Sequence, residues 1–135
     1  MKRRGPLRIP VTRGLKDIYS MDMRVAYQAA RSGQFTLVAF SRLAAAISVV
    51  RSALEQNQTK LPLAIETLDA TIETLVAIRN RGDKTGVWEI TESEFPLVLD
   101  GIDMVEQSIG TLDVALLERT AASLFQLMHG EQGGK

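Results

Sequence analysis

The sequence contains no cysteine and only one histidine, His129. A chain without cysteine forms no disulfide, no thiolate nucleophile and no cysteine-ligated zinc site. A single histidine cannot build a cluster of histidine ligands, and its place at the expected end of a helix favours a capping role over catalysis. We therefore expect a protein without a bound metal or a cofactor.

Long hydrophobic runs are also missing. No apolar stretch approaches the roughly 20 residues that a membrane-spanning helix requires, and none follows the basic N-terminus as a secretory signal would. Hydrophobic residues nevertheless make up 45% of the 135 residues and charged residues 24%, which is typical of one folded domain with one core. We expect a soluble, cytoplasmic protein that does not enter a membrane.

The net charge is zero, but the charges are unevenly distributed. The first sixteen residues carry six basic side chains and no acid, which leaves ten basic against sixteen acidic residues in the rest. Glycine and proline interrupt residues 1–14, so we expect an extended basic arm there. Such an arm can follow a phosphate backbone or an acidic protein surface, or it can serve only to keep the chain soluble. The candidate contact residues are Lys2, Arg3, Arg4, Arg8, Arg13 and Lys16.

Apolar residues recur at helical spacing from Leu15 onward, and no segment shows the sustained alternation of a strand. The spacing predicts helices over about 15–32, 35–55, 61–81, 91–109 and 111–130. Long helices joined by short loops favour an antiparallel arrangement. We predict an all-α protein, an antiparallel bundle of four to five helices over residues 15–130. The extended basic N-terminal arm of residues 1–14 precedes it, and a frayed tail of residues 131–135 follows it.

Each predicted helix carries one apolar face that we expect to lie in the core. The face of the first helix comprises Leu15, Ile18, Met21, Val25 and Ala29. The other four faces comprise Phe35, Val38, Ala39, Leu43, Ala46, Ile47, Val50 and Leu54; Leu61, Ile65, Leu68, Ile72, Leu75 and Ile78; Phe95, Val98, Leu99, Ile102, Val105 and Ile109; and Val114, Leu117, Ala121, Leu124, Phe125 and Met128. Five such faces have more apolar surface than a four-helix core readily hides, so we expect a homodimer.

Proline, glycine and threonine mark several helix ends. Pro62 fits the first turn of the third helix, where its missing N–H costs nothing, and Gly82 is expected to end that helix. Thr111 is expected to cap the last helix, which Gly130 should end.

The fourth helix has two candidate starts. Thr91 and the glutamate three residues later form a capping box, which predicts a start at Thr91. Pro96 is late for the first turn of such a helix, so a start at Ser93 remains an alternative. Just before this point lies Trp88, the only tryptophan of the chain. It is either an interface anchor or a plug that seals the loop between the third and fourth helices.

No catalytic set can be assembled from these residue types, because the chain has one histidine, no cysteine and no serine elbow flanked by glycines. Asp83-Lys84-Thr85-Gly86 matches the phosphorylated quartet of ion-pumping ATPases, but it follows a helix rather than the buried strand that this chemistry needs. Asp100, Asp103 and Glu106 share one helical face without a histidine, which favours a solvated acidic face. We therefore expect no enzymatic activity and no catalytic residue.

Three features are similar to one group of proteins. They are the alanine-rich "FSRLAAAISVV", a long following helix that ends in arginine and glycine, and "KTGVWEITESEFPLVLDGIDMVEQSI". This pattern, over roughly residues 20–128, resembles small proteobacterial proteins of prophage and plasmid neighbourhoods that are automatically labelled "Fis family transcriptional regulator". The group usually has an arginine in place of Val87. The resemblance implies a mobile-element origin, and the activity of the group is not established.

A true Fis protein has a basic C-terminal helix-turn-helix, and this sequence does not have one. Its last helix and tail contain only two basic residues, Arg119 and Lys135, against three acidic residues. We therefore predict a non-enzymatic helical protein of mobile-element origin that acts by protein–protein interaction, with itself as one expected partner. The alternative is a DNA-associated transcriptional regulator that uses the basic N-terminal arm.

Overall fold

The computed structural model describes residues 13–57 and 61–133, and in this part of the chain the backbone is almost entirely helical. The elements are α1 (Arg13–Arg31), α2 (Leu37–Gln56), α3 (Pro62–Thr85), α4 (Phe95–Ser108), the short 3-10 helix η1 (Ile109–Thr111) and α5 (Val114–Gly133). No strand occurs within those two ranges. The predicted all-α bundle of four to five helices is confirmed.

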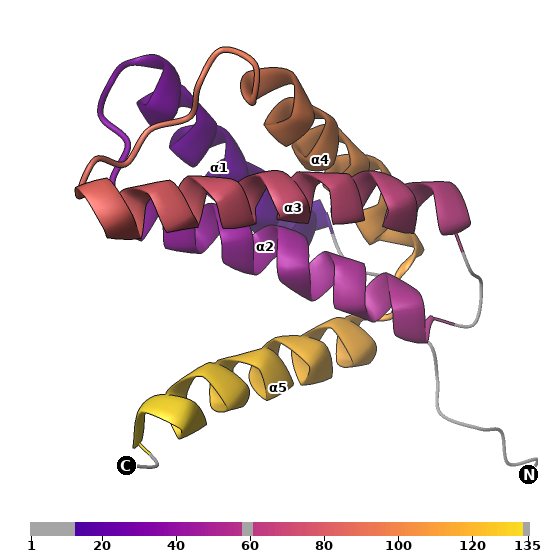
Figure 1. The fold of residues 1–135 in the computed structure, drawn as a ribbon. Coiled ribbons are helices and arrows are strands. Elements are labelled where there is room, and N and C mark those ends of the chain that lie inside the picture. Colours follow the sequence, from indigo (N-terminus) through magenta and orange to yellow (C-terminus); the bar gives the residue numbers. More distant parts are fainter. Residues whose placement is uncertain (1–12, 58–60, 134–135) are drawn as a thin grey trace, which may run out of the picture.

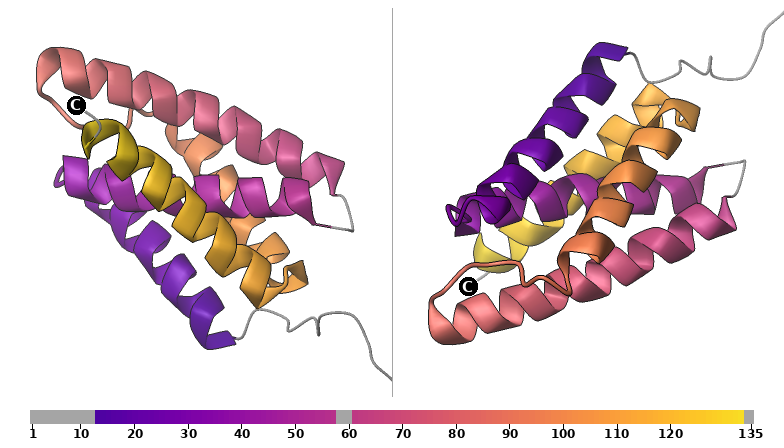
Figure 2. Two further views of the ribbon diagram at one scale, coloured as in Figure 1. Left: turned by 90° about the horizontal axis from the view of Figure 1, so that it is seen from below. Right: turned by 90° about the horizontal axis from the view of Figure 1, so that it is seen from above.

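Helix α2 lies at the centre of the bundle (Figure 1). It contacts α1, α3, α4 and α5, and it runs antiparallel to α3. Helix α4 packs against both α3 and α1, so these three helices cover one side of α2 (Figure 2). Helix α5 packs on the other side of α2, away from α3 and α4 (Figures 1 and 2). The core therefore follows α2.

Helix α2 is also long and apolar enough, by length and composition alone, to cross a membrane. The expectation that no apolar stretch approaches that length is wrong for this helix. Because α2 is surrounded by four other helices, it needs apolar side chains on more than one face. Contacts with other helices within one bundle thus account for the same composition.

The predicted apolar faces of α2, α3 and α4 are largely confirmed, whereas on α5 Leu117 is buried and Ala121 and Leu124 are only partly buried. The predicted side chains that are buried are Phe35, Leu43, Ala46, Ile47, Val50, Leu54, Leu68, Leu75, Ile78, Phe95, Val98, Ile102, Val105, Ile109 and Leu117. Val38 is an exception, since it is 61% exposed. The side chains of Phe125, Met128 and His129 lie outside the described residues.

The face predicted for the first helix is wrong for three of its five residues. Ile18, Met21 and Val25 are exposed, whereas Met23 and Ala26 are buried. Helix α1 carries apolar residues on two sides, and the side that faces the bundle also has Leu15, Tyr19, Tyr27 and Ala30 packed against the core. That side offers more apolar area, because it includes both tyrosine rings.

Both ends of the predicted domain differ by a few residues from the helices that form. Helix α1 begins at Arg13, so residues 13 and 14 are helical, and residues 1–12 of the predicted arm lie outside the described chain. Helix α5 continues past Gly130 to Gly133, so part of the predicted tail is also helical. Within the described ranges only Gly33 and Gly86 have a positive φ, so Gly130 keeps a helical backbone.

Helix α3 begins at Pro62, as predicted, but it does not end at Gly82. It ends at Thr85, and Gly86 caps it: the Gly86 N–H donates to the Gly82 carbonyl at 2.8 Å, and its left-handed backbone (φ 79°) turns the chain out of the helix. Gly82 is buried inside the helix, where a Cβ would lie only 2.6 Å from the ring of Trp88. Glycine is needed at position 82 for the close approach of the tryptophan, not for the turn.

The start of α4 differs from both predicted starts, because the helix begins at Phe95. Only half of the capping box forms: the Thr91 N–H donates to Glu94 Oε1 at 2.9 Å, but the Thr91 hydroxyl lies 3.3 Å from the Ser93 hydroxyl. The later start places Pro96 in the first turn, where proline is tolerated.

Helix α5 is capped by a different residue from the predicted Thr111. Asp113 Oδ2 accepts a hydrogen bond from the Leu116 N–H at 3.1 Å. Thr111 lies in η1, and its hydroxyl donates to the Ser108 carbonyl at 2.7 Å. The short 3-10 turn after α4 thus shifts the cap of α5 by two residues.

Candidate interaction surface

Three large apolar side chains of α1 point away from the bundle. Ile18, Met21 and Val25 are 59%, 65% and 59% exposed, and their i, i+3, i+7 spacing places them on one face of the helix. We call these three residues the α1 stripe. Among the side chains that the structure describes, the other exposed large apolar ones lie on α2, α3, α4 and the loop before α4, and none of those elements has three of them at this spacing.

The sequence interpretation missed the α1 stripe because it assigned these residues to the core. Periodicity alone could not choose between the two apolar sides of α1. A usable signal was the aspartate before Ile18 and the aspartate after Met21, Asp17 and Asp22, both of which are exposed. Acidic residues beside an apolar face are typical of a helix side that meets water.

A cluster of charged residues holds α1 against α4. Arg24 Nε donates to Glu106 Oε2 at 3.0 Å, and Arg24 Nη2 donates to Glu106 Oε1 at 2.7 Å and to Asp103 Oδ1 at 2.9 Å. The Ser20 hydroxyl also donates to Glu106. The prediction of a solvated acidic face holds for exposed Asp100 and is wrong for Glu106, whose side chain is 24% exposed. Asp103 is 47% exposed but also pairs with Arg24. Arg24 is one of three arginines in α1 and its partners lie on α4, so the sequence carried no signal for this pairing.

Aromatic contacts fix the C-terminal half of α1 in the same orientation. The ring of Tyr27 meets the ring of Phe95 edge-on, with centroids 5.5 Å apart. The Arg31 guanidinium lies over the same Phe95 ring at 4.6 Å. Since these contacts and the Arg24 cluster lie on the bundle side of α1, the α1 stripe is held on its solvent side.

Trp88 lies in the loop between α3 and α4 and is partly buried against the core. Its ring packs on the backbone of Gly82 and lies 5.2 Å from the ring of Phe40. Arg81 holds the same loop, because its Nη2 donates to the Glu89 carbonyl at 3.0 Å and to Glu94 Oε1 at 2.7 Å. This geometry supports the loop plug over the interface anchor.

The predicted basic contact residues are only partly within the described chain. Lys2, Arg3, Arg4 and Arg8 lie outside it. Arg13 is exposed at the first residue of α1, whereas Lys16 lies near Glu106 and helps to lower the pKa of that carboxyl.

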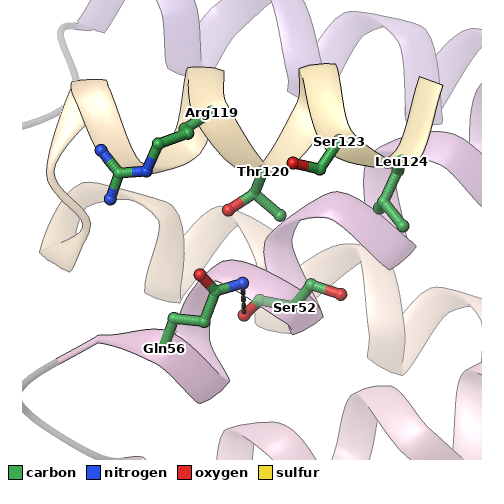
Figure 3. A pocket seen from close by; sticks show the side chains of 6 residues that line it. All are labelled: Ser52, Gln56, Arg119, Thr120, Ser123 and Leu124. Atoms are coloured by element: carbon green, nitrogen blue, oxygen red, sulfur yellow. Dashed lines mark hydrogen bonds between the residues drawn. The ribbon is translucent and has the colours of Figure 1, made fainter. Parts of the chain in front are cut away.

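A depression of about 230 Å³ lies between α2 and α5 (Figure 3). It is lined by Ser52, Gln56, Arg119, Thr120, Ser123 and Leu124. Two of its polar groups donate to backbone carbonyls of their own helices: Gln56 to Ser52 at 3.3 Å and Thr120 to Leu116 at 2.8 Å. Arg119 is the one ionisable side chain of the six, so the depression has no acid–base pair.

Acid should weaken the contact between α1 and α4. Hydrogen bonds from Arg24 hold the pKa of Glu106 below its ordinary value, although burial opposes this effect. A carboxyl with a lowered pKa stabilises the fold above its unfolded pKa, and this stabilisation is lost as the pH falls toward the folded pKa. We expect the melting temperature to fall below about pH 4.3, the usual glutamate pKa, and to fall less steeply in Glu106→Gln.

The control for this titration is Glu66→Gln, which changes an exposed carboxylate of α3. It should keep the steep acid dependence of the unchanged protein. Melting curves followed by circular dichroism at a series of pH values measure the effect. An identical pH profile for Glu106→Gln and the unchanged protein would contradict the assignment.

Within residues 13–57 and 61–133, no group of three or more histidine or acidic side chains is placed to hold a metal ion. Comparison of the chain with models of protein families, with curated proteins and with solved structures finds no match. The similarity to proteins labelled as Fis family regulators stays a prediction, and function has to be argued from the surface of the molecule.

Proposed function

We propose that this chain is a non-enzymatic protein that acts by binding another protein, and that the α1 stripe is its contact surface. The observation that carries the proposal is the exposure of three large apolar side chains on one face of a helix whose opposite face packs against the core. Single exposed apolar residues are common on protein surfaces, but a contiguous apolar face marks an interaction site.

The support for α1 makes this surface suitable for binding. Arg24 joins α1 to α4 through two carboxylates, and Tyr27 packs on Phe95. A helix face held in place before binding loses little conformational entropy in the complex, so more of the gain from apolar burial remains as affinity. An amphipathic helix on the partner is the simplest complement to such a stripe.

The test uses the full chain as bait in a lysate of its native host. We expect the protein to retain a protein partner in nuclease-treated lysate. The amount of partner retained by Met21→Lys should be at least tenfold lower, because complex formation would remove the charged lysine between Ile18 and Val25 from water. Val76→Lys is the matched control, since Val76 is 51% exposed on α3, and it should retain the partner.

Two results would count against the proposal. Equal retention by Met21→Lys and by the unchanged protein would remove the α1 stripe from the contact surface. Retention that disappears after nuclease treatment would instead favour the DNA-associated regulator with a basic arm.

A further inference from the structure

We infer that the partner of the α1 stripe is a second copy of this chain, packed with its α1 antiparallel to the first. The inference rests on the proposed function and names the partner for the same surface. It is carried by the spacing of the residues along the stripe and by the charges beside it.

The solvent side of α1 has the spacing of a coiled-coil seam. The steps along this side alternate between four and three residues, through Gly14, Ile18, Met21, Val25 and Gln28. In one antiparallel register Ile18 faces Met21 of the second copy, and Gly14 faces Val25 of the second copy. This register covers all three large side chains of both helices and places the bulky valine opposite the residue without a side chain.

The charges beside the seam favour this antiparallel register over a parallel pair. Asp17 and Arg24 flank the seam on one side, and Asp22 flanks it on the other. A parallel pair would place Asp17 of each copy beside Asp22 of the other, which brings like charges together twice. The antiparallel pair places Asp17 beside Arg24 instead.

Other antiparallel registers are less favourable. A shift by one heptad places Arg24 beside Arg24 and leaves Ile18 opposite Gln28. Arg24 is already bonded to Asp103 and Glu106, but its side chain is 43% exposed. Arg24 therefore contributes mainly because Asp17 of the second copy lies beside it and not beside Asp22, and less by forming a new ion pair.

The seam buries few side chains, so the dimer should be weak. Three large residues per copy cover much less than the roughly 800 Å² per partner of a standard interface. We expect a dissociation constant on the order of ten to a hundred micromolar, and sedimentation equilibrium above that range should show a dimer. Met21→Lys should be monomeric under the same conditions, while Val76→Lys should dimerise as the unchanged protein does.

Disulfide trapping determines the orientation, because the chain has no cysteine of its own. In the antiparallel register, Gly14 lies beside Val25 of the second copy, whereas the two copies of Gly14 lie about 16 Å apart along the helix axis. A disulfide needs Cα atoms about 4.4 to 6.8 Å apart. Mixing Gly14→Cys with Val25→Cys under mild oxidation should therefore give a mixed dimer, and neither variant alone should form one.

Charge reversal gives an independent result of opposite sign for the two orientations. In the antiparallel pair Asp17→Lys places a lysine beside Arg24 and should weaken the dimer about twofold to fivefold, as expected for exposed charge pairs. In a parallel pair the same change would place the lysine beside Asp22 and strengthen the dimer. Self-disulfides of Gly14→Cys and of Val25→Cys, or a tighter Asp17→Lys dimer, would overturn the antiparallel register.

A strict monomer in sedimentation, together with no mixed disulfide, would overturn the whole inference. The proposed function would survive that result if Met21→Lys still lost a partner from the lysate. It would fail separately if the lysate partner were retained by Met21→Lys. The two failures are therefore distinguishable.

Discussion

Replacing Gly101 by alanine is expected to destabilise the fold by about 2 to 3 kcal/mol. A Cβ at position 101 would lie 2.4 Å from the Thr71 hydroxyl oxygen and 2.6 Å from its methyl carbon. Thr71 is 1% exposed, and its hydroxyl donates to the Leu97 carbonyl at 2.8 Å across the contact between α3 and α4. The two helices must therefore separate, and the buried hydrogen bond is weakened.

Several effects combine in this estimate. Overpacking typically costs about 1 to 3 kcal/mol, and weakening a buried hydrogen bond adds to that cost. The better helix propensity of alanine returns up to about 1 kcal/mol. Urea unfolding measures the difference, with Gly110→Ala as the control, since a Cβ at Gly110 would meet no atom within 4 Å.

A double-mutant cycle with Thr71→Ala tests the cause of the effect. If the clash with Thr71 is responsible, the double variant should lose less stability than the sum of the two single variants. Additive losses, or a Gly101→Ala variant as stable as Gly110→Ala, would contradict the close approach of α3 and α4 at this point.

Replacing Glu94 by alanine should cost a similar amount, about 2 to 3 kcal/mol. The Glu94 side chain is only 14% exposed, and it accepts hydrogen bonds from Arg81 Nη1 at 3.1 Å, from Arg81 Nη2 at 2.7 Å and from the Thr91 N–H at 2.9 Å. Burial raises the pKa of Glu94, but these hydrogen bonds outweigh burial, so the pKa lies below its ordinary value. Alanine would leave a partly buried guanidinium without its carboxylate.

Two controls separate this role from ordinary surface and capping effects. Glu92→Ala, at a side chain that is 91% exposed, should change stability by less than about 0.5 kcal/mol. Thr91→Ala should also change it by less than about 0.5 kcal/mol, because the Thr91 hydroxyl does not complete the capping box. A loss near 1 kcal/mol for Thr91→Ala would restore the predicted helix start at Thr91.

The single tryptophan reports on the same loop. Trp88 is partly buried behind the segment that Arg81 and Glu94 hold. Glu94→Ala should therefore shift the fluorescence of folded Trp88 toward that of a water-exposed indole. An unchanged emission spectrum together with unchanged urea unfolding would show that Arg81 and Glu94 do not hold the loop.

Much of the fold could be predicted from local patterns. The apolar faces of α3 and α4 follow from helical periodicity, because each of these helices offers one dominant apolar side and the core has to use it. Pro62 marks the first turn of α3, since the missing N–H has no partner there in any case. Such features depend on neighbours a few residues away.

The remaining features depend on contacts between residues far apart in the sequence. Helix α1 has two apolar sides, and only its packing against α2 and α4 determines which of them is buried and leaves Ile18, Met21 and Val25 exposed. The need for glycine at positions 82 and 101 likewise cannot be seen in the sequence, because it comes from the close approach of Trp88 to Gly82 and of Thr71 to Gly101.

The same dependence applies to the charged groups. Arg24 belongs to α1, whereas Asp103 and Glu106 belong to α4, so no spacing along the chain identifies them as partners. Local propensity and periodicity thus establish that the chain forms amphipathic helices and roughly where they lie. Which faces meet is settled by the packing of whole helices, since burial of the larger apolar area and pairing of the charges between helices are satisfied together only in the assembled bundle.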